Sequence, residues 1–275
     1  MAKTAHEPSL EELQLAAAAS DAWAQYLLGE RYRLGEGVPQ DDEVAYRWFE
    51  AAAEQGEPNA QNNLGSMLRN GMGTAADSEK AVHWYGLAAN GGNSDAMFNL
   101  GKSYLHGLGT PIDLPTALEW FSRAAEQGHI EAICELGTMY RFGHGTGKNI
   151  EAAASFHVIS ALEGDAVAIG NLADYREELE AIALGEAQSA ALSLARMYER
   201  GLGVDKDQAK TLAWLTWAAE DCAPDESADY GREVAEMHEF FTAHLPSDVK
   251  KRSRAEYRAL RERARRPARR GKSSK

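Results

Sequence analysis

One glycine-rich segment, Gly143-His144-Gly145-Thr146-Gly147, has a composition that could cradle a phosphate group. The backbone N–H groups of such a loop bind phosphate when the loop follows a strand and ends in Lys-Ser or Lys-Thr. No strand pattern precedes this segment, and neither dipeptide follows it. Its first and third residues also belong to a repeated turn described below. We therefore interpret the segment as a turn and predict no nucleotide or other cofactor.

Histidines and cysteines give no better indication of catalysis. His238-Glu239 resembles the start of a zinc-protease motif, but that motif needs a second histidine four positions after the first, and Thr242 is there instead. Cys134 is isolated in the sequence, which is typical of a small buried hydrophobe rather than a nucleophile. The other histidines considered are scattered, and we expect most to be solvated or half-packed: His83, His106, His129 and His157. We predict no metal site, no catalytic residue and no enzyme activity, although a Ser/His/Asp triad is a spatial arrangement that one sequence does not reveal.

The elements that position these residues come from a period of 36 residues. Leu-Gly pairs begin at 28, 64, 100 and 136. The same step separates further columns of Tyr or Leu, of two glycines, of Asp or Asn, and of Trp or Phe, at 32, 35, 37, 41 and 48 in the first copy. A later copy begins with Leu194 after an interval that does not fit the period.

Each copy of the period predicts two helices joined by a glycine turn. In the first copy, Ala24, Leu28 and Tyr32 lie on one face of a helix. Two glycines then permit positive φ in the turn, and Asp41 has the type and position of the next helix's N-cap. Trp48 lies on the packing face of that second helix, and we expect this column to fill a large buried contact between helices. No segment shows the alternation of a strand.

These columns resemble the Sel-1-like repeat, a relative of the tetratricopeptide repeat, over residues 21–221. The resemblance implies an all-α fold, an α/α superhelical solenoid of stacked helix-turn-helix units. We expect an N-terminal capping helix in 1–20, the repeat array in 21–221, a C-terminal capping helix in 222–246, and a basic tail in 247–275 that is helical and then disordered. The expected repeat units lie near 21–56, 57–92, 93–128, 129–164, 165–184 (degenerate) and 185–221. The degenerate unit lacks the glycine turn, and we expect its helix to run into the next one near Gly185.

The resemblance also implies a binding surface, because first helices line the concave groove of tetratricopeptide arrays. Positions one column from the packing residues should then face a protein or peptide partner. The partner-binding residues predicted in this way are Tyr26, Arg33, Asn62, Arg69, Phe98, Lys102 and Arg141. Three arginines in one column indicate a basic ladder, and aromatic anchors beside arginine are typical of protein interfaces. The alternative is a solvated helix face. The Asn63, Asn99, Asn171 column is expected to bond between neighbouring repeats.

Charge is unevenly distributed along the chain. The sequence has 29 basic and 42 acidic residues, a net charge of −13. Residues 246–275 hold thirteen of the basic and three of the acidic residues, which is +10, and the rest of the chain carries −23. We expect a helix from Ser247, its N-cap, to Arg266. The tail could bind nucleic acid or anionic lipid, or fold back on the acidic body. The nucleic-acid-binding residues predicted here are Arg265, Arg266, Arg269, Arg270 and Lys272.

Two functions of different class follow. The first is a non-catalytic scaffold or adaptor that binds a partner protein or peptide through the solenoid's concave face. The alternative is a nucleic-acid-associated protein tethered by its basic tail. Family members that bind or hydrolyse β-lactams are disulfide-rich and exported, whereas this chain has two cysteines, so a hydrolase is a distant alternative. Residues 1–20 lack the apolar core of a secretory signal, and no run reaches the length of a membrane span. We expect a cytoplasmic protein.

Overall fold

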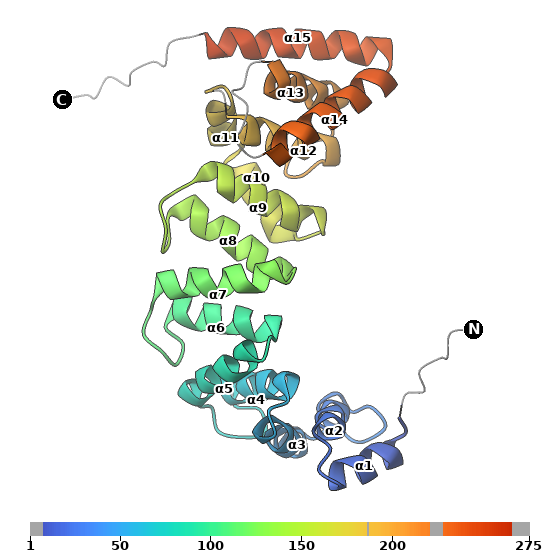
Figure 1. The fold of residues 1–275 in the computed structure, drawn as a ribbon, viewed down its shortest axis with the longest axis vertical. Helices are drawn as coiled ribbons and strands as arrows, with labels where there is room; N and C mark the ends of the chain where they lie inside the picture. Colours follow the sequence, from blue (N-terminus) through green and yellow to red (C-terminus); the bar gives the residue numbers. More distant parts are fainter. Residues whose placement is uncertain (1–7, 186, 221–227, 266–275) are drawn as a thin grey trace, which may run out of the picture. The chain divides into compact units, whose positions relative to one another are not determined.

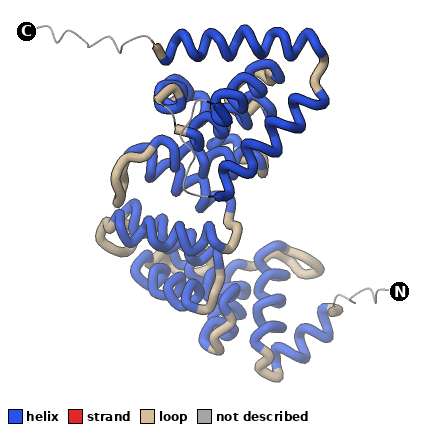
Figure 2. Tube along the Cα trace, turned by 45° about the horizontal axis from the view of Figure 1, so that its top comes forward, coloured by secondary structure: helices blue, strands red, loops and turns tan. Residues whose placement is uncertain are grey.

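The structure, a computed structural model, describes residues 8–185, 187–220 and 228–265, which form fifteen α-helices and no strand (Figures 1 and 2). This confirms the predicted all-α class. The helices are α1 (Leu10–Ala18), α2 (Ala22–Leu34), α3 (Asp42–Glu54), α4 (Pro58–Asn70), α5 (Ser78–Asn90), α6 (Ser94–His106), α7 (Leu114–Glu126), α8 (Ile130–Phe142), α9 (Ile150–Leu162), α10 (Ala166–Asp174), α11 (Arg176–Ala183), α12 (Gln188–Arg200), α13 (Gln208–Glu220), α14 (Ala228–His244) and α15 (Ser247–Ala264). The chain divides into two compact units, Met1–Ala132 and Ile133–Lys275.

Within each repeat the helix boundaries follow the sequence columns. The first glycine of the turn ends α2, α4 and α6 in the left-handed conformation. The Asp or Asn column then caps α3, α5, α7 and α9, each side chain accepting a hydrogen bond from the backbone N–H three residues on. These caps satisfy donors that a helix start leaves free. The predicted helix, glycine turn, helix unit is confirmed.

A contact between a glycine and a ring joins the two helices of a repeat. The glycine of each Leu-Gly pair lies in the first helix, against a ring of the second. A Cβ placed on Gly29 would lie 2.7 Å from the Phe49 ring, and one on Gly65 would lie 2.8 Å from the Tyr85 ring. A Cβ on Gly101 would likewise lie 2.7 Å from the Phe121 ring. Carbon atoms do not normally come as close as these Cβ atoms would, so only a residue without a side chain permits the ring to take this place.

The tryptophan column does not fill that contact. Trp48, Trp84 and Trp120 are all half-buried, whereas the residue after each of them is completely buried. The expectation of a large buried tryptophan contact is therefore wrong by one position. The ring that reaches the glycine column occupies the site, and the larger indole lies at its edge.

The degenerate unit differs from its expected form. Its first helix, α10, ends at Asp174, and the separate helix α11 ends at Ala183. The prediction that this unit runs into the next helix near Gly185 is wrong, because α12 begins only at Gln188. With no second repeat helix in this unit, α9 packs against both α10 and α12.

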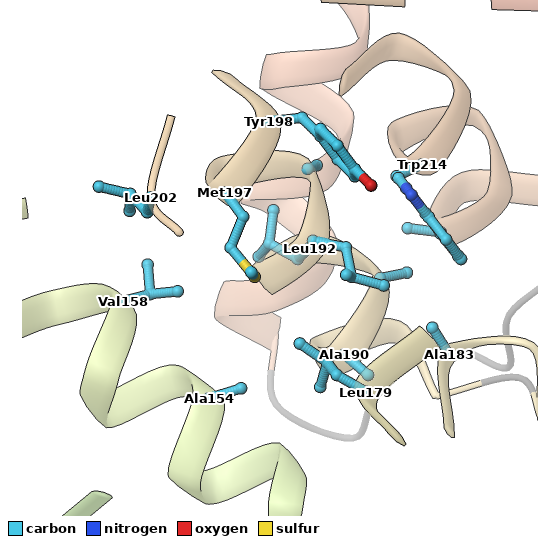
Figure 3. Packing of buried hydrophobic residues seen from close by; sticks show 14 of the residues in the cluster. Ala154, Val158, Leu179, Ala183, Ala190, Leu192, Met197, Tyr198, Leu202 and Trp214 are labelled. Carbon is cyan, nitrogen blue, oxygen red and sulfur yellow. The ribbon is translucent and has the colours of Figure 1, made fainter. Parts of the chain in front are cut away.

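The core of the second unit forms around α12. Figure 3 shows Ala154 and Val158 of α9 facing Met197 and Leu192 of α12, with Trp214 of α13 on another side. Of the thirteen residues of α12, nine are buried, because α9, α11, α13 and α14 all contact it. The last two helices, α14 and α15, both pack against α13.

The second glycine of the turn allows successive repeats to stack. Gly73 has φ +66°, and a Cβ there would lie 2.1 Å from the carbonyl oxygen of Asp42, at the start of the preceding repeat's second helix. Gly37, in the first repeat, has φ +75° and nothing within 4 Å of such a Cβ. The two glycines share one backbone conformation and differ only in this neighbour.

We therefore expect Gly73→Ala to destabilise the protein much more than Gly37→Ala. The left-handed conformation alone costs alanine about 1–2 kcal/mol at either site. At Gly73 the clash with backbone adds an overpacking cost of about 1–3 kcal/mol. Urea unfolding followed by circular dichroism measures both variants, and equal midpoints would contradict this account of stacking.

Candidate partner-binding faces

The first exposed feature of the amino-terminal unit is an aromatic series that leads outward from the core. Phe49 is completely buried, and its ring centroid lies 6.1 Å from that of Tyr26. Tyr26 in turn lies 5.0 Å from Trp23, whose side chain is 52% exposed. Burial and the carboxylates Glu30 and Glu57 raise the pKa of Tyr26. The buried ring thus supports a surface aromatic in a fixed position.

The arginine predicted next to this series is already paired. The Arg33 guanidinium donates two hydrogen bonds to Glu30, at 3.2 and 2.7 Å. Asn63 of the next repeat donates to the same carboxylate at 2.5 Å. Arg33 therefore presents a neutral ion pair rather than a free cation.

The second repeat offers less exposed surface. Asn62 is buried and accepts a hydrogen bond from Asn99 at 3.0 Å, so it joins repeats rather than facing a partner. Together with the Asn63 bond, this confirms that the asparagine column bonds between neighbours. Arg69 is half-buried and forms no ion pair within the described residues. Of the two predicted ladder arginines in this unit, Arg33 is paired with Glu30, whereas Arg69 could still pair with a partner's carboxylate.

The third repeat holds a second aromatic group. The Phe98 ring lies 5.7 Å from the buried Phe121 ring and is stacked on His129 at 4.6 Å. The Lys102 ammonium lies 5.3 Å from the Phe98 centroid. His129 also lies 3.3 Å from carboxylate oxygens of Asp95 and Glu131. Phe98 and Lys102 thus lie together on α6, as the column pattern predicted.

Arg141, in the carboxyl-terminal unit, is held by its own unit. Its guanidinium donates to Asn171 at 3.4 Å and lies 3.6 Å from Asp174. It also stands over the Tyr175 ring, 4.8 Å from the centroid. With 18% of its side chain exposed, Arg141 serves chiefly to attach α8 to α10.

Behind Arg141 lies a buried polar cluster that the column analysis missed. His157 is completely buried, contrary to the expectation of solvated or half-packed histidines. Its Nδ1 lies 2.7 Å from the Tyr175 hydroxyl, and Asn171 Nδ2 donates to its Nε2 at 3.2 Å. Thr138 Oγ1 is 3.4 Å from the same Nε2. Burial, with a contribution from the Arg141 charge, lowers the pKa of His157 to about 4.

A sequence signal for His157 exists in the period itself. It occupies the column of Phe49, Tyr85 and Phe121, and a Cβ on Gly137 would lie 2.6 Å from its ring. Cys134 nearby is buried, and that burial raises its pKa to about 12. The thiol is therefore protonated at neutral pH, consistent with the prediction of a small hydrophobe.

The basic segment folds back on the carboxyl-terminal unit as far as it is described. Arg252 donates to Asp207 at 2.7 Å, Arg263 to Glu180 at 2.8 Å, and Tyr257 to Glu220 at 2.7 Å. The predicted helix is α15, but its N-cap is Pro246 and not Ser247. Arg265 follows the helix and is exposed. The other predicted nucleic-acid-binding residues, Arg266, Arg269, Arg270 and Lys272, lie outside the described residues, as does Cys222.

The histidines of α14 have partners of other kinds. His238 lies 3.2 Å from the Thr216 hydroxyl, and His244 lies 2.8 Å from the Phe240 carbonyl. Three or more His, Cys, Asp or Glu side chains placed to hold a metal ion are not found among the described residues. In the same part of the chain, no helix has both the length and the apolar character to cross a membrane.

Comparison with known proteins identifies the family of these repeats. A family model described as Sel1 repeat matches residues 24–57, 58–93, 94–129, 130–165 and 188–221. The degenerate unit falls between the last two matches. No curated protein matches the chain.

Two solved structures share the fold. A protective antigen present in uropathogenic Escherichia coli strains, which displays an SLR fold, has 25% sequence identity and a TM-score of 0.59, over 92% of this chain and 63% of that one. This chain therefore spans less than two thirds of the Escherichia coli protein. A Sel1 repeat protein from Oxalobacter formigenes has 28% identity and a TM-score of 0.55, over 83% of this chain and 91% of that one. Both likenesses support the predicted solenoid class.

The buried histidine predicts a specific dependence of stability on pH. Because the pKa of His157 falls from 6.5 to about 4 on folding, its neutral form is favoured in the fold. The associated stability is present above pH 6.5 and is lost as the pH falls toward 4. Between pH 7 and pH 5 this loss is about 2 kcal/mol.

We expect His157→Phe, which places a ring of the same column on Gly137, to remove that loss. Urea unfolding at pH 7 and pH 5 should show a smaller decrease for the variant than for the natural chain. We expect the variant to be less stable at both pH values, because Tyr175 and Asn171 lose a partner. This loss is common to both pH values, so the two decreases can still be compared. Identical decreases would contradict the buried, neutral state of His157.

Proposed function

This chain belongs to the Sel1 repeat family, and on that premise we propose that it is a non-catalytic scaffold that binds a partner protein or peptide. The fold is one that commonly serves protein interaction. The proposed contact surface, called here the first-helix face, consists of one exposed side chain, Trp23, and four half-buried side chains on α2, α4 and α6. Its members are Trp23, Tyr26, Arg69, Phe98 and Lys102.

The observation that carries this proposal is an exposed tryptophan, Trp23, whose ring is held in place by other aromatic side chains. Trp23 is 52% exposed, yet its ring packs at a tilt against Tyr26, which in turn packs against the buried Phe49. An aromatic held in this way loses little side-chain entropy when a partner covers it, while it buries a large apolar area. Hot spots of protein interfaces are enriched in Trp, Tyr and Arg for these reasons.

The surroundings of the aromatics indicate the chemistry of the partner. Glu30 and Arg33 form a pair beside Tyr26, and Lys102 and His129 flank Phe98. A face with both signs of charge around apolar anchors suits a protein segment with an apolar side chain and mixed polar neighbours. It is less suited to the carboxylate-only recognition that a ladder of free arginines would give.

The proposal of a non-catalytic role is supported by the state of the reactive groups. Cys134 is a buried thiol with a raised pKa, so it lacks the thiolate that nucleophilic attack needs. His157 is fully enclosed, and its ring contacts are with Thr138, Asn171 and Tyr175. Neither group is open to a substrate. The cytoplasmic location stays a prediction.

A matched pair of variants tests the first-helix face. Trp23→Ala/Phe98→Ala removes two aromatic anchors, whereas Leu87→Ala/Ile112→Ala removes two apolar side chains that are 40% and 65% exposed elsewhere in the same unit. Affinity capture from a lysate of the source organism, followed by calorimetry with the purified partner, compares the two with the natural chain. We expect the aromatic variant to bind at least tenfold more weakly, since each hot-spot residue contributes about 2 kcal/mol or more.

The control should retain the affinity of the natural chain. Partners recovered equally well with the aromatic variant would contradict the assignment of the face. Equal losses in both variants would also contradict it, because the effect would then follow from general loss of apolar surface.

A further inference from the structure

The outward face of α15 carries a stripe of basic side chains. Its residues recur at intervals of three and four, which places them on one side of a helix. The basic stripe consists of Lys251, Arg254, Arg258 and Arg261 of α15 and of Arg265, the C-cap residue that follows it, all exposed. We propose that this stripe binds the phosphodiester backbone of a nucleic-acid duplex without reading its sequence. The proposal is independent of the partner proposed for the first-helix face.

The opposite side of α15 is fixed to the protein. Leu260 and Ser253 are buried, and Val249 and Tyr257 are half-buried against the core of the carboxyl-terminal unit. These four positions form a second stripe at helical spacing, and α15 packs along α13 through it. The basic stripe is therefore presented by an anchored helix, so that binding does not have to order the segment that carries it.

Basic residues at the edge of the packed face have a different role. Arg252 is paired with Asp207, and Arg263 is paired with Glu180, which also binds Arg176. These pairs occupy carboxylates of the acidic body that lie under the helix.

The stripe is separate from those pairs. Lys251, Arg254, Arg258 and Arg265 form no ion pair within the described part of the chain. The Arg258 side chain donates to the Arg254 carbonyl, which leaves its terminal nitrogens for a ligand. The acidic body therefore neutralises the anchoring arginines but not these four side chains of the stripe.

The composition of the stripe suits a phosphate backbone and argues against a lipid surface or a single strand. Four of its five residues are arginine, whose planar fork donates two hydrogen bonds to one phosphate. Along α15, no large apolar side chain of the described residues is exposed, so the helix lacks the apolar face that inserts into a lipid surface. No aromatic side chain lies on the stripe to stack on an unpaired base, which favours a duplex over a single strand.

The length of the stripe suits several phosphates. Arg265 lies fourteen positions after Lys251, which is about 21 Å along a helix. A duplex strand carries one phosphate per 3.4 Å of its axis, so about six phosphates lie along this length. Contacts limited to phosphates position a protein on a duplex but give no sequence preference.

Fluorescence anisotropy with a labelled 20-base-pair duplex tests the proposal, with DNA and RNA in separate arms. The full chain is compared with Lys251→Gln/Arg258→Gln at several NaCl concentrations. The control, Lys80→Gln/Arg47→Gln, removes the same two charges from side chains that are 70% and 74% exposed in the amino-terminal unit. All three proteins retain residues 266–275 and should show the same thermal midpoint.

We expect the stripe variant to bind the duplex about tenfold more weakly at 50 mM NaCl, and the slope of log Kd against log salt to fall by about 2. The control should match the natural chain. A preference between the arms would identify DNA or RNA as the source of the backbone.

Three results would overturn the proposal. One is no binding of either duplex by the full chain at 50 mM NaCl. Another is an equal loss of affinity in the stripe variant and the control. The third is tighter binding to phosphatidylserine vesicles or to polyglutamate than to both duplexes, which would assign the stripe to a lipid surface or to an acidic protein.

Discussion

The contact between a glycine in the first helix and a ring in the second sets the geometry of each repeat. Gly29, Gly65 and Gly101 each accept a ring that any side chain would exclude. This close approach buries the ring completely and fixes the distance between the paired helices. The glycine turn, the Asp or Asn caps and the stacking of one repeat on the next are all built on helix pairs held in this way.

The same contact positions the aromatic side chains of the first-helix face, of which Trp23 is exposed and Tyr26 and Phe98 are half-buried. Phe49 supports Tyr26 and Trp23, and Phe121 supports Phe98. In the second repeat the ring is Tyr85, whose hydroxyl is 3.1 Å from the Ser66 hydroxyl, and the position equivalent to Tyr26 and Phe98 holds the buried Asn62 instead of an aromatic. The repeat whose buried ring is a tyrosine thus has a polar residue at this position of its first helix. The two repeats whose buried ring is a phenylalanine have an aromatic residue there.

Much of the fold follows from the sequence, since it rests on local chemistry. Helix periodicity, the turn glycines and the caps at Asp41 and its equivalents depend on neighbouring residues, and they are all present. The choice between Trp84 and Tyr85 as the buried ring depends on which side chain meets Gly65, a contact between two helices that one helix's pattern does not determine. The end of α10 at Asp174 was missed because the period breaks there.

The candidate sites are less predictable for the same reason. Phe98 and Lys102 are neighbours on one helix, and the column pattern brings them together correctly. Whether Arg33 or Arg141 is free to bind a partner depends on carboxylate and amide side chains elsewhere in the fold. Both arginines are paired, Arg33 with Glu30 and Arg141 with Asp174. The outward stripe of α15 is visible in the sequence, but its separation from the anchoring arginines becomes evident only when their partners are known.

The last full repeat provides a natural test of the glycine and ring contact. There Ala195 replaces the glycine and Leu215 replaces the ring, and both are completely buried. Alanine is larger than the glycine that it replaces, and leucine is smaller than the ring that it replaces. The two changes compensate for one another, as a fixed distance between the helices requires. Transplanting this pair as Gly65→Ala/Tyr85→Leu, with each single variant alongside, therefore measures the coupling directly by urea unfolding. The account predicts that the double variant is more stable than Gly65→Ala alone, whereas costs that simply add would contradict it.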